Sequence, residues 1–407
     1  SKVLSVLFSK NPHTVRLEGT PHLVELCTDE KIRDVVMEVA TDNLKHLLLE
    51  KPPEAIASHY LGRPTMPSEW TESAVKACLY LYLAILPLNQ ALIQELAQVY
   101  VKTVNEAKRA ILRLLEEPIC NMGMDSPELL TLVETCPKGG ETLITRIIHI
   151  LTEKAPPSEA LVSRVRELYN RRVSDVRFLI PVLTGLSKKE VIAVLPKLIK
   201  LNPYVVKEVF NRLWGVTLDT GSSPLTPVDL LVALHLIDNE KCDVKTVIKA
   251  TGLCFAERNI YTGEVLAVVL QQLMEQPQLP TLFMRTVIQT LAHYPKLLGF
   301  VMNILTRLIA KQVWKQRKVW EGFIKCCQRA VSSSTGGAVA QLLLQLPPPQ
   351  LADVFTTAPD LHSELLKYLD TFTETQRAAI PTSILEVIET KGESITASDE
   401  TSIPTEK

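Results

Sequence analysis

The stretch Ser187–Leu201, SKKEVIAVLPKLIKL, decides the fold class. It opens with a capping box, because the side chains of Ser187 and Glu190 can each satisfy a backbone amide that the first helical turn leaves unpaired. Apolar residues then recur at helical spacing, and lysines occupy the remaining positions. The stretch therefore predicts an amphipathic helix with one buried face and one hydrated face.

Helix start signals of the same kind continue along the chain. Three of them have a capping residue followed by proline at the first helical position: Ser126-Pro127, Asn202-Pro203 and Thr226-Pro227. Successive helix pairs begin near residues 187, 226, 263 and 296, in steps of 39, 37 and 33, close to the roughly 40-residue period of HEAT and armadillo repeats. We therefore predict an all-α fold, a HEAT/ARM-like helical-repeat solenoid in which antiparallel helix pairs stack into a superhelix.

The composition favours the same class, with 46% apolar residues, only 5% aromatic residues and 15 glycines in 407 positions. We divide the chain into an N-terminal helical segment with long helices at 1–125, HEAT-like repeats at 126–389 and a disordered tail at 390–407. The run from Asn89 to Glu117 predicts one long helix. The tail is polar and acidic, and its few apolar residues cannot offset the entropy lost on ordering.

The formal net charge of -1 gives no overall attraction to nucleic acid or to a membrane surface. The longest uncharged stretch, Ala77 to Gln94, contains Pro87 and Asn89, so it predicts a turn between two helices rather than a membrane span. The first residues lack the pattern of a signal peptide. The eight cysteines form no C-x-x-C motif, and we expect small buried side chains in a reducing compartment.

Motifs of catalysis are missing from the sequence, including those of nucleotide-binding loops, zinc proteases and serine hydrolases. We therefore expect no enzyme activity, no catalytic residue, no cofactor, no metal and no small-molecule substrate. The nearest approach to a metal site is His235 with Asp238, three residues apart on one predicted helix. A surface hydrogen bond or ion pair accounts for that pair more simply than a shared metal.

One stretch interleaves aromatic residues with cations, as a surface that binds RNA or phosphate does. We call it the aromatic-basic strip, and its residues are Trp314, Lys315, Arg317, Lys318, Trp320, Lys325 and Arg329. The simpler interpretation is that the tryptophans pack in the core while the cations form a hydrated face, because helical spacing accounts for the rings without a ligand. The sequence leaves both interpretations open.

Two further groups of cations are candidates for binding an acidic partner. The arginine strip consists of Arg164, Arg166, Arg171, Arg172 and Arg177. The lysine strip consists of Lys188, Lys189, Lys197, Lys200, Lys207 and Arg212. The outer face of repeat helices usually carries such residues, so a solvated surface is the simpler interpretation of both.

Three segments go beyond generic helical-repeat sequence. They are DVRFLIPVLTGLSKKEVIAVLPKLIKLNPYVVKEVFNRL from Asp175, IKATGLCFAERNIYTGEVLAVVLQQLMEQ from Ile248, and MRTVIQTLAHYPKLLGFVMNILTRLIAKQVWKQRKVWEGFIKCCQR from Met284. These segments resemble the C-terminal domain of the symplekin family, and the resemblance extends over residues 4–389.

The resemblance implies a nuclear, non-catalytic scaffold of the machinery that cleaves pre-mRNA 3′ ends for polyadenylation and for histone messages. The implied partners are the endonuclease subunit of the cleavage and polyadenylation specificity factor, its inactive paralogue, and the cleavage stimulation factor. RNA contact would then be indirect. Direct RNA binding through the aromatic-basic strip is the alternative, and an importin-type adaptor is a weaker one, because no ladder of groove Trp and Asn residues repeats.

Overall fold

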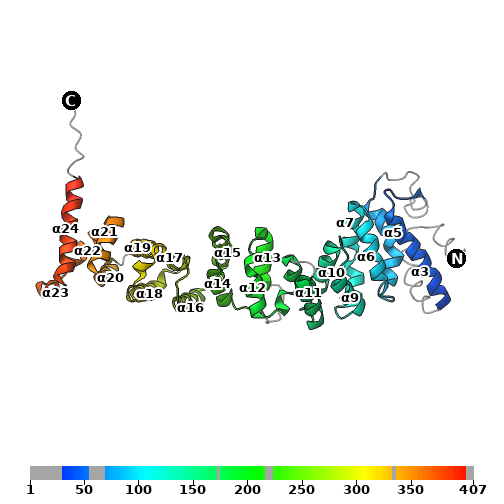
Figure 1. The fold of residues 1–407 in the computed structure, drawn as a ribbon, viewed down its shortest axis with the longest axis horizontal. Helices are drawn as coiled ribbons and strands as arrows, with labels where there is room; N and C mark the ends of the chain where they lie inside the picture. The colour runs from blue at the N-terminus through cyan, green and yellow to red at the C-terminus, as the bar shows by residue number, and fades with distance from the viewer. Residues whose placement is uncertain (1–29, 55–68, 172–174, 216–222, 332–335, 400–407) are drawn as a thin grey trace, which may run out of the picture. The chain divides into compact units, whose positions relative to one another are not determined.

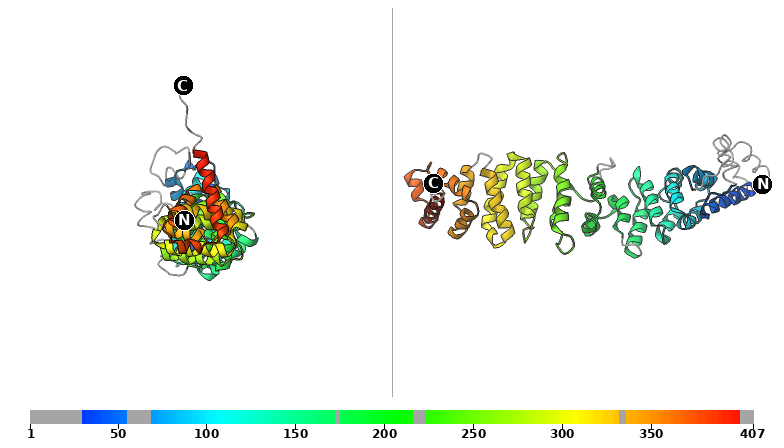
Figure 2. Two further views of the ribbon diagram at one scale, coloured as in Figure 1. Left: turned by 90° about the vertical axis from the view of Figure 1, so that its left-hand side faces the viewer. Right: turned by 90° about the horizontal axis from the view of Figure 1, so that it is seen from above.

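The structure is a computed structural model that describes residues 30–54, 69–171, 175–215, 223–331 and 336–399. Every regular element within these ranges is a helix (Figure 1). The chain divides into two compact units, Ser1–Pro224 and Leu225–Lys407. Within each unit consecutive helices stack side by side (Figures 1 and 2). The prediction of an all-α helical-repeat fold is confirmed.

The first unit places helices next to partners that are near in sequence. Its elements are α3 (Glu30–Lys45), η1 (His46–Leu48), α5 (Glu72–Ile85), α6 (Leu92–Lys102), α7 (Asn105–Leu114), α8 (Glu116–Met122), α9 (Pro127–Thr135), α10 (Glu141–Glu153), α11 (Glu159–Arg171), η2 (Val176–Gly185), α12 (Lys188–Leu198) and α13 (Pro203–Leu213). Helix α5 packs on α3 and α7, and α11 packs on α9 and η2. Each helix therefore covers the apolar face of a neighbour that cannot bury it alone.

The single long helix predicted from Asn89 to Glu117 is wrong, because α6, α7 and the start of α8 occupy this stretch. The backbone is extended at Thr103 and at Val104, so α6 ends and α7 starts there. The buried Thr103 hydroxyl donates a hydrogen bond to the carbonyl oxygen of Leu47 in η1. A contact between segments far apart in sequence thus interrupts a run that local helix propensity would continue.

The segment that follows Asp175 differs from a regular α-helix. Residues Val176–Gly185 form a 3₁₀ helix, η2, with Pro181 inside it. The Asp175 carboxylate caps its start by accepting a hydrogen bond from the Arg177 amide at 3.0 Å. This element contacts α10, α11, α12 and α13, so it lies among helices that precede and follow it.

The second unit continues the same arrangement. Its elements are α14 (Pro227–His235), α15 (Val244–Ala256), α16 (Gly263–Met274), α17 (Phe283–His293), η3 (Pro295–Leu297), α18 (Leu298–Ala310), η4 (Val313–Lys315), α19 (Arg317–Val331), α20 (Gly336–Leu343), α21 (Pro348–Thr357), α22 (Pro359–Leu369), α23 (Glu374–Ala378) and α24 (Thr382–Asp399). Helix α14 packs on α15 and α16, α17 packs on α19, and α20 packs on α22. Contacts with the next helix and with the one after it are those of stacked helix pairs.

The helix N-termini that the sequence predicts are present in the structure. Ser126, Asn202 and Thr226 are N-caps whose side chains accept hydrogen bonds from amides of the first turn. Both halves of the predicted box between Ser187 and Glu190 are formed. Each such cap contributes about 1 kcal/mol to helix stability, and together the caps explain why these boundaries are legible in the sequence.

A glycine allows α19 to lie close to α17. A Cβ atom built on Gly322 would meet the Cβ of Met284 and lie 3.0 Å from its Cγ. Met284 is buried on α17, so it has little freedom to move away. On the same helix Cys326 and Cys327 are buried, as are four further cysteines, and only Cys120 of the described cysteines is exposed. The prediction of small buried cysteines is therefore confirmed for six of them.

The C-terminal end differs from the disordered tail predicted from residue 390. Helix α24 continues to Asp399, and residues 400–407 lie outside the described residues. Ile384 and Ile388 of this helix are buried, and α24 contacts α21 and α22. Extending an anchored helix costs less free energy than nucleating a new one, so the polar residues up to 399 can follow the packed turns.

Candidate interaction surfaces

The aromatic rings of the aromatic-basic strip are packed. Trp320 is 6% exposed and stacks on Phe323, with ring centroids 5.2 Å apart. Its edge meets the ring of the half-buried Trp314 at a centroid distance of 6.4 Å. The Trp320 Nε1 donates a hydrogen bond to Asp353 Oδ2 on α21 at 2.6 Å. The core interpretation of Trp320 is therefore the one that the geometry supports, since its face is covered by protein.

The cations of this strip face solvent. Lys318, Lys325 and Arg329 are seven and four residues apart on α19, which places them on one face of the helix. Lys315, at the end of η4, is also exposed. Arg317 forms an ion pair with Glu321, the only acidic residue of α19, at 3.1 Å. This leaves a basic surface in which the buried Trp320 ring takes no part.

The arginine strip is largely neutralised by carboxylates. The ion pairs are Arg164 with Glu134 at 2.7 Å, Arg166 with Glu190 at 2.7 Å, Arg171 with Glu167 at 3.9 Å and Arg177 with Asp175 at 2.6 Å. Hydrogen bonding to Arg177 lowers the pKa of the Asp175 carboxyl below its ordinary value. Arg172 lies outside the described residues. Such pairs favour a solvated ionic surface over a site that awaits an acidic partner.

Helix α13 carries Lys207 and Arg212 of the lysine strip and also an exposed aromatic residue that the sequence did not single out. Lys188, Lys189, Lys200 and Lys207 are exposed, as expected for an outer face, and Lys197 donates to the Tyr169 hydroxyl at 2.9 Å. Arg212 instead pairs with Glu208 on the same helix at 3.2 Å. Tyr204 is 86% exposed near the start of α13. The buried face of α13 is made by Val206, Val209, Phe210 and Leu213, so the position of Tyr204 outside that apolar spacing was the available signal.

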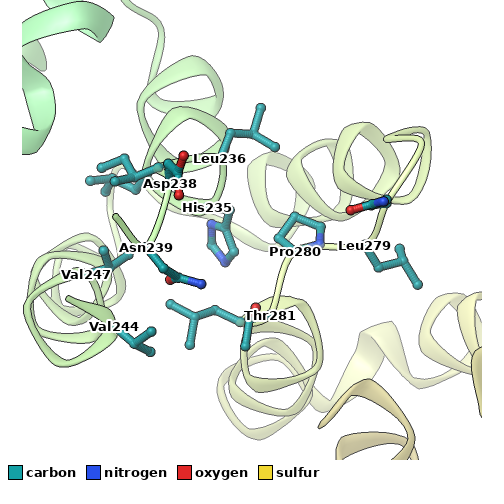
Figure 3. A pocket seen from close by; sticks show the side chains of 13 residues that line it. His235, Leu236, Asp238, Asn239, Val244, Val247, Leu279, Pro280 and Thr281 are labelled. Atoms are coloured by element: carbon teal, nitrogen blue, oxygen red, sulfur yellow. The ribbon is translucent and has the colours of Figure 1, made fainter. Parts of the chain in front are cut away.

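The second unit contains a pocket of about 250 Å³ at one end of α14 (Figure 3). It lies between the α14–α15 turn and the connection from α16 to α17. Thirteen residues line it: Leu234, His235, Leu236, Ile237, Asp238, Asn239, Val244, Val247, Gln278, Leu279, Pro280, Thr281 and Leu282. The sequence offers no signal for this pocket, because the two connections lie about 40 residues apart in the chain.

His235 forms part of the pocket wall but does not pair with Asp238 as the sequence predicts. Its Nδ1 lies 2.7 Å from the Leu231 carbonyl oxygen, and its Nε2 lies 2.6 Å from Thr286 Oγ1 on α17. A carbonyl oxygen can only accept, so Nδ1 carries the proton and Nε2 accepts from the threonine hydroxyl. Burial lowers the pKa of His235 to about 4, although the bond to Leu231 acts in the opposite direction. The residue is a neutral, hydrogen-bonded core histidine.

The Asp238 carboxylate has a different partner. It accepts a hydrogen bond from the Glu240 amide at 3.0 Å and so stabilises the α14–α15 turn. In the described part of the chain, no three His, Cys, Asp or Glu side chains are grouped closely enough to hold a metal ion. Among those same residues, no helix has the length and apolar character needed to cross a membrane.

The fold and these surfaces define a class of protein, the helical-repeat proteins, whose stacked helices present extended surfaces. Residues 175–358 match the family model described as the C-terminal part of symplekin tight junction protein. The match is to the same family that the sequence resemblance indicates. No solved structure matches the chain. The matched residues include η2, α12, α13, the pocket and the whole aromatic-basic strip.

Proposed function

We propose that this chain is a non-catalytic scaffold of nuclear pre-mRNA 3′-end processing, for polyadenylated and for histone messages. In this proposal the chain binds the endonuclease subunit and its inactive paralogue within the cleavage and polyadenylation specificity factor, and it also contacts the cleavage stimulation factor. The match of residues 175–358 to the symplekin C-terminal family carries the proposal, because this family is associated with scaffolding in mRNA 3′-end processing.

The mechanism is geometric. Stacked helix pairs expose a series of outward faces, and two subunits that bind one chain gain a high effective concentration for each other. One such surface is basic and consists of Lys315, Lys318 and Lys325. These three lysines are exposed, and within the described residues they make no ion pair or hydrogen bond. This face favours an acidic surface on a partner.

Reversing the charge of that face tests its role in binding. We expect the triple variant Lys315→Glu, Lys318→Glu, Lys325→Glu to bind the C-terminal regions of the endonuclease and its paralogue about tenfold more weakly at low salt, with a smaller loss at high salt. Isothermal titration calorimetry at two salt concentrations measures both values. The matched control reverses three exposed lysines of the first unit, Lys76, Lys138 and Lys154. Equal affinities for the two triple variants would exclude the face as a binding site.

Direct RNA binding by the aromatic-basic strip has less support. Recognition of single-stranded RNA needs an aromatic face on which a base can stack. The Trp320 ring is already stacked on Phe323, and its Nε1 is bonded to Asp353. The remaining cations can attract phosphates without sequence preference, but they attract an acidic protein surface equally well.

A further inference from the structure

Neighbouring helices of the second unit carry opposite charge. Helices α15 and α17 contain Lys245, Lys249 and Arg285 but no acidic residue. Helices α14 and α16 contain Asp229 and Glu264 but no lysine or arginine. The two kinds of helix form separate rows, with α15 and α17 in the same row as α19 and with α14 and α16 in the other (Figure 1). Positive charge is therefore gathered on one side of this unit.

The cations of α15, α17 and α19 point outward. Lys245 and Lys249 are four residues apart on α15, and Lys318 and Lys325 are seven apart on α19, so each pair lies on one helix face. Arg285 is the corresponding cation of α17. All five are exposed, and within the described residues none of them makes an ion pair or a side-chain hydrogen bond.

The three helices are adjacent. Helix α17 packs on α19, and the ring of Phe255 on α15 lies 5.9 Å from the ring of His293 on α17. Axes of packed helices are roughly 8–10 Å apart, so the outward faces of three neighbours extend over roughly 20 Å. A fully extended segment of about six or seven residues covers that distance.

The acidic residues nearest in sequence to these cations have other partners. The Asp243 carboxylate caps α15 by accepting a hydrogen bond from the Thr246 amide at 3.0 Å. Glu321 on α19 pairs with an arginine of the same helix at 3.1 Å. Lys245 and Lys249 repel each other, since like charges four residues apart destabilise a helix by about 0.2–0.5 kcal/mol. A negative charge bound opposite them would relieve this repulsion.

The chemistry of these helices favours an acidic protein segment over RNA. Their phenylalanine and tryptophan side chains, Phe255, Phe283, Trp320 and Phe323, are all buried, so these helices offer no such ring on which a base can stack. The net charge of the chain is -1, which gives a long polyanion no overall attraction. A short acidic segment, in contrast, needs only the cations that it touches, because charges beyond about 10 Å are screened by salt.

We propose that the outward faces of α15, α17 and α19 form one basic surface that binds an extended acidic segment of a partner subunit. The Asp and Glu side chains of this segment lie opposite Lys249, Arg285 and Lys318. The proposal rests on the scaffold function above, and it adds α15 and α17 to the basic surface already described on η4 and α19. Because the segment meets a cation on each of three helices, its direction and register are fixed, and the bound subunit is oriented.

Reversing the charge of α15 and α17 tests this proposal. The wild-type chain is first titrated with the C-terminal regions of the endonuclease and its paralogue, because absence of binding would count against the scaffold function itself. We expect the triple variant Lys245→Glu, Lys249→Glu, Arg285→Glu to bind them about tenfold more weakly at low salt, with a smaller loss at high salt. The matched control reverses the exposed Lys76, Lys138 and Lys154, and its affinity should equal that of the wild type.

Two results of these titrations would overturn the proposal. If reversing Lys315, Lys318 and Lys325 weakened binding while the α15 and α17 variant bound like the wild type, the partner would contact α19 alone, and the scaffold function would stand. If the α15 and α17 variant kept its affinity for the nuclease regions but lost affinity for a single-stranded oligouridylate, the surface would bind RNA instead.

Carbodiimide crosslinking of the assembled complex identifies the occupant, since this reagent joins a lysine amine only to a carboxylate in contact with it. We expect mass spectrometry to find Lys249 and Lys318 joined to Asp or Glu residues that lie within about seven positions of each other in one partner chain. Crosslinks from these lysines to two different partner chains, to a second copy of this chain, or to no partner would contradict the proposal.

Discussion

Replacing Trp320 with alanine will destabilise α19 by about 3–5 kcal/mol, the usual cost of truncating a large aromatic side chain in a core. The ring is 6% exposed, and the change removes the stack on Phe323, the edge contact with Trp314 and the hydrogen bond to Asp353. Hydrogen exchange of α19 amides, followed by mass spectrometry at increasing urea, measures the loss for this helix.

Two control variants separate packing from charge. Trp320→Phe keeps an apolar ring against Phe323 and loses the hydrogen bond to the exposed Asp353, so we expect a cost of about 1 kcal/mol. Lys318→Ala on the exposed face should change stability by less than about 0.5 kcal/mol. If Trp320→Ala were as stable as the wild type but lost affinity for RNA, the packed interpretation of the ring would be wrong.

Acid will destabilise the second unit through His235. Its pKa of about 4 in the folded chain is below the ordinary value of 6.5, so the unfolded chain binds more protons between these two pH values. Protonation of His235 therefore does not change the free energy of unfolding above pH 6.5. As the pH is lowered from 6.5 to 4, this protonation makes the free energy of unfolding smaller. The difference between the two pKa values corresponds to about 3 kcal/mol.

The variant His235→Gln isolates this contribution, because glutamine stays uncharged and still offers a donor and an acceptor near Leu231 and Thr286. Between pH 7 and pH 4 the variant should lose about 3 kcal/mol less stability than the wild type, as measured by hydrogen exchange of α14 amides in urea. His149 in the first unit also has a lowered pKa, but it is present in both proteins. If the stability of the wild type and that of the variant fell in parallel as the pH was lowered, the histidine would have an ordinary pKa in the folded chain, and this prediction would be wrong.

Helix boundaries were predictable from the sequence because their stabilising groups are local. The capping bond of Ser187 joins residues three positions apart, and the cap of Thr226 does the same. The end of α6 at Thr103 was not predictable, since the bond that interrupts the helix reaches Leu47, 56 positions away. Local periodicity indicates which secondary structure a segment prefers, and contacts with the rest of the fold determine where the segment departs from it.

The candidate sites follow the same rule. Helical spacing allowed Trp320 to be either a core residue or an RNA platform, and its bond to Asp353, 33 positions away, supports the core. The partner of His235 is Thr286, 51 positions away, rather than the neighbouring Asp238. The cations of α19 were placed correctly on an outer face, because the spacing of Val319, Phe323 and Ile324 alone fixes the buried side of that helix.

The central claim, that this chain holds the two nuclease subunits together, is tested most directly by assembly. The full chain is co-expressed with the C-terminal regions of the endonuclease and of its inactive paralogue, and the product is analysed by size-exclusion chromatography with light scattering. The scaffold account predicts a single peak whose mass equals one copy of each of the three chains. Elution of the helical chain alone, with the two nuclease regions in a separate peak, would contradict it.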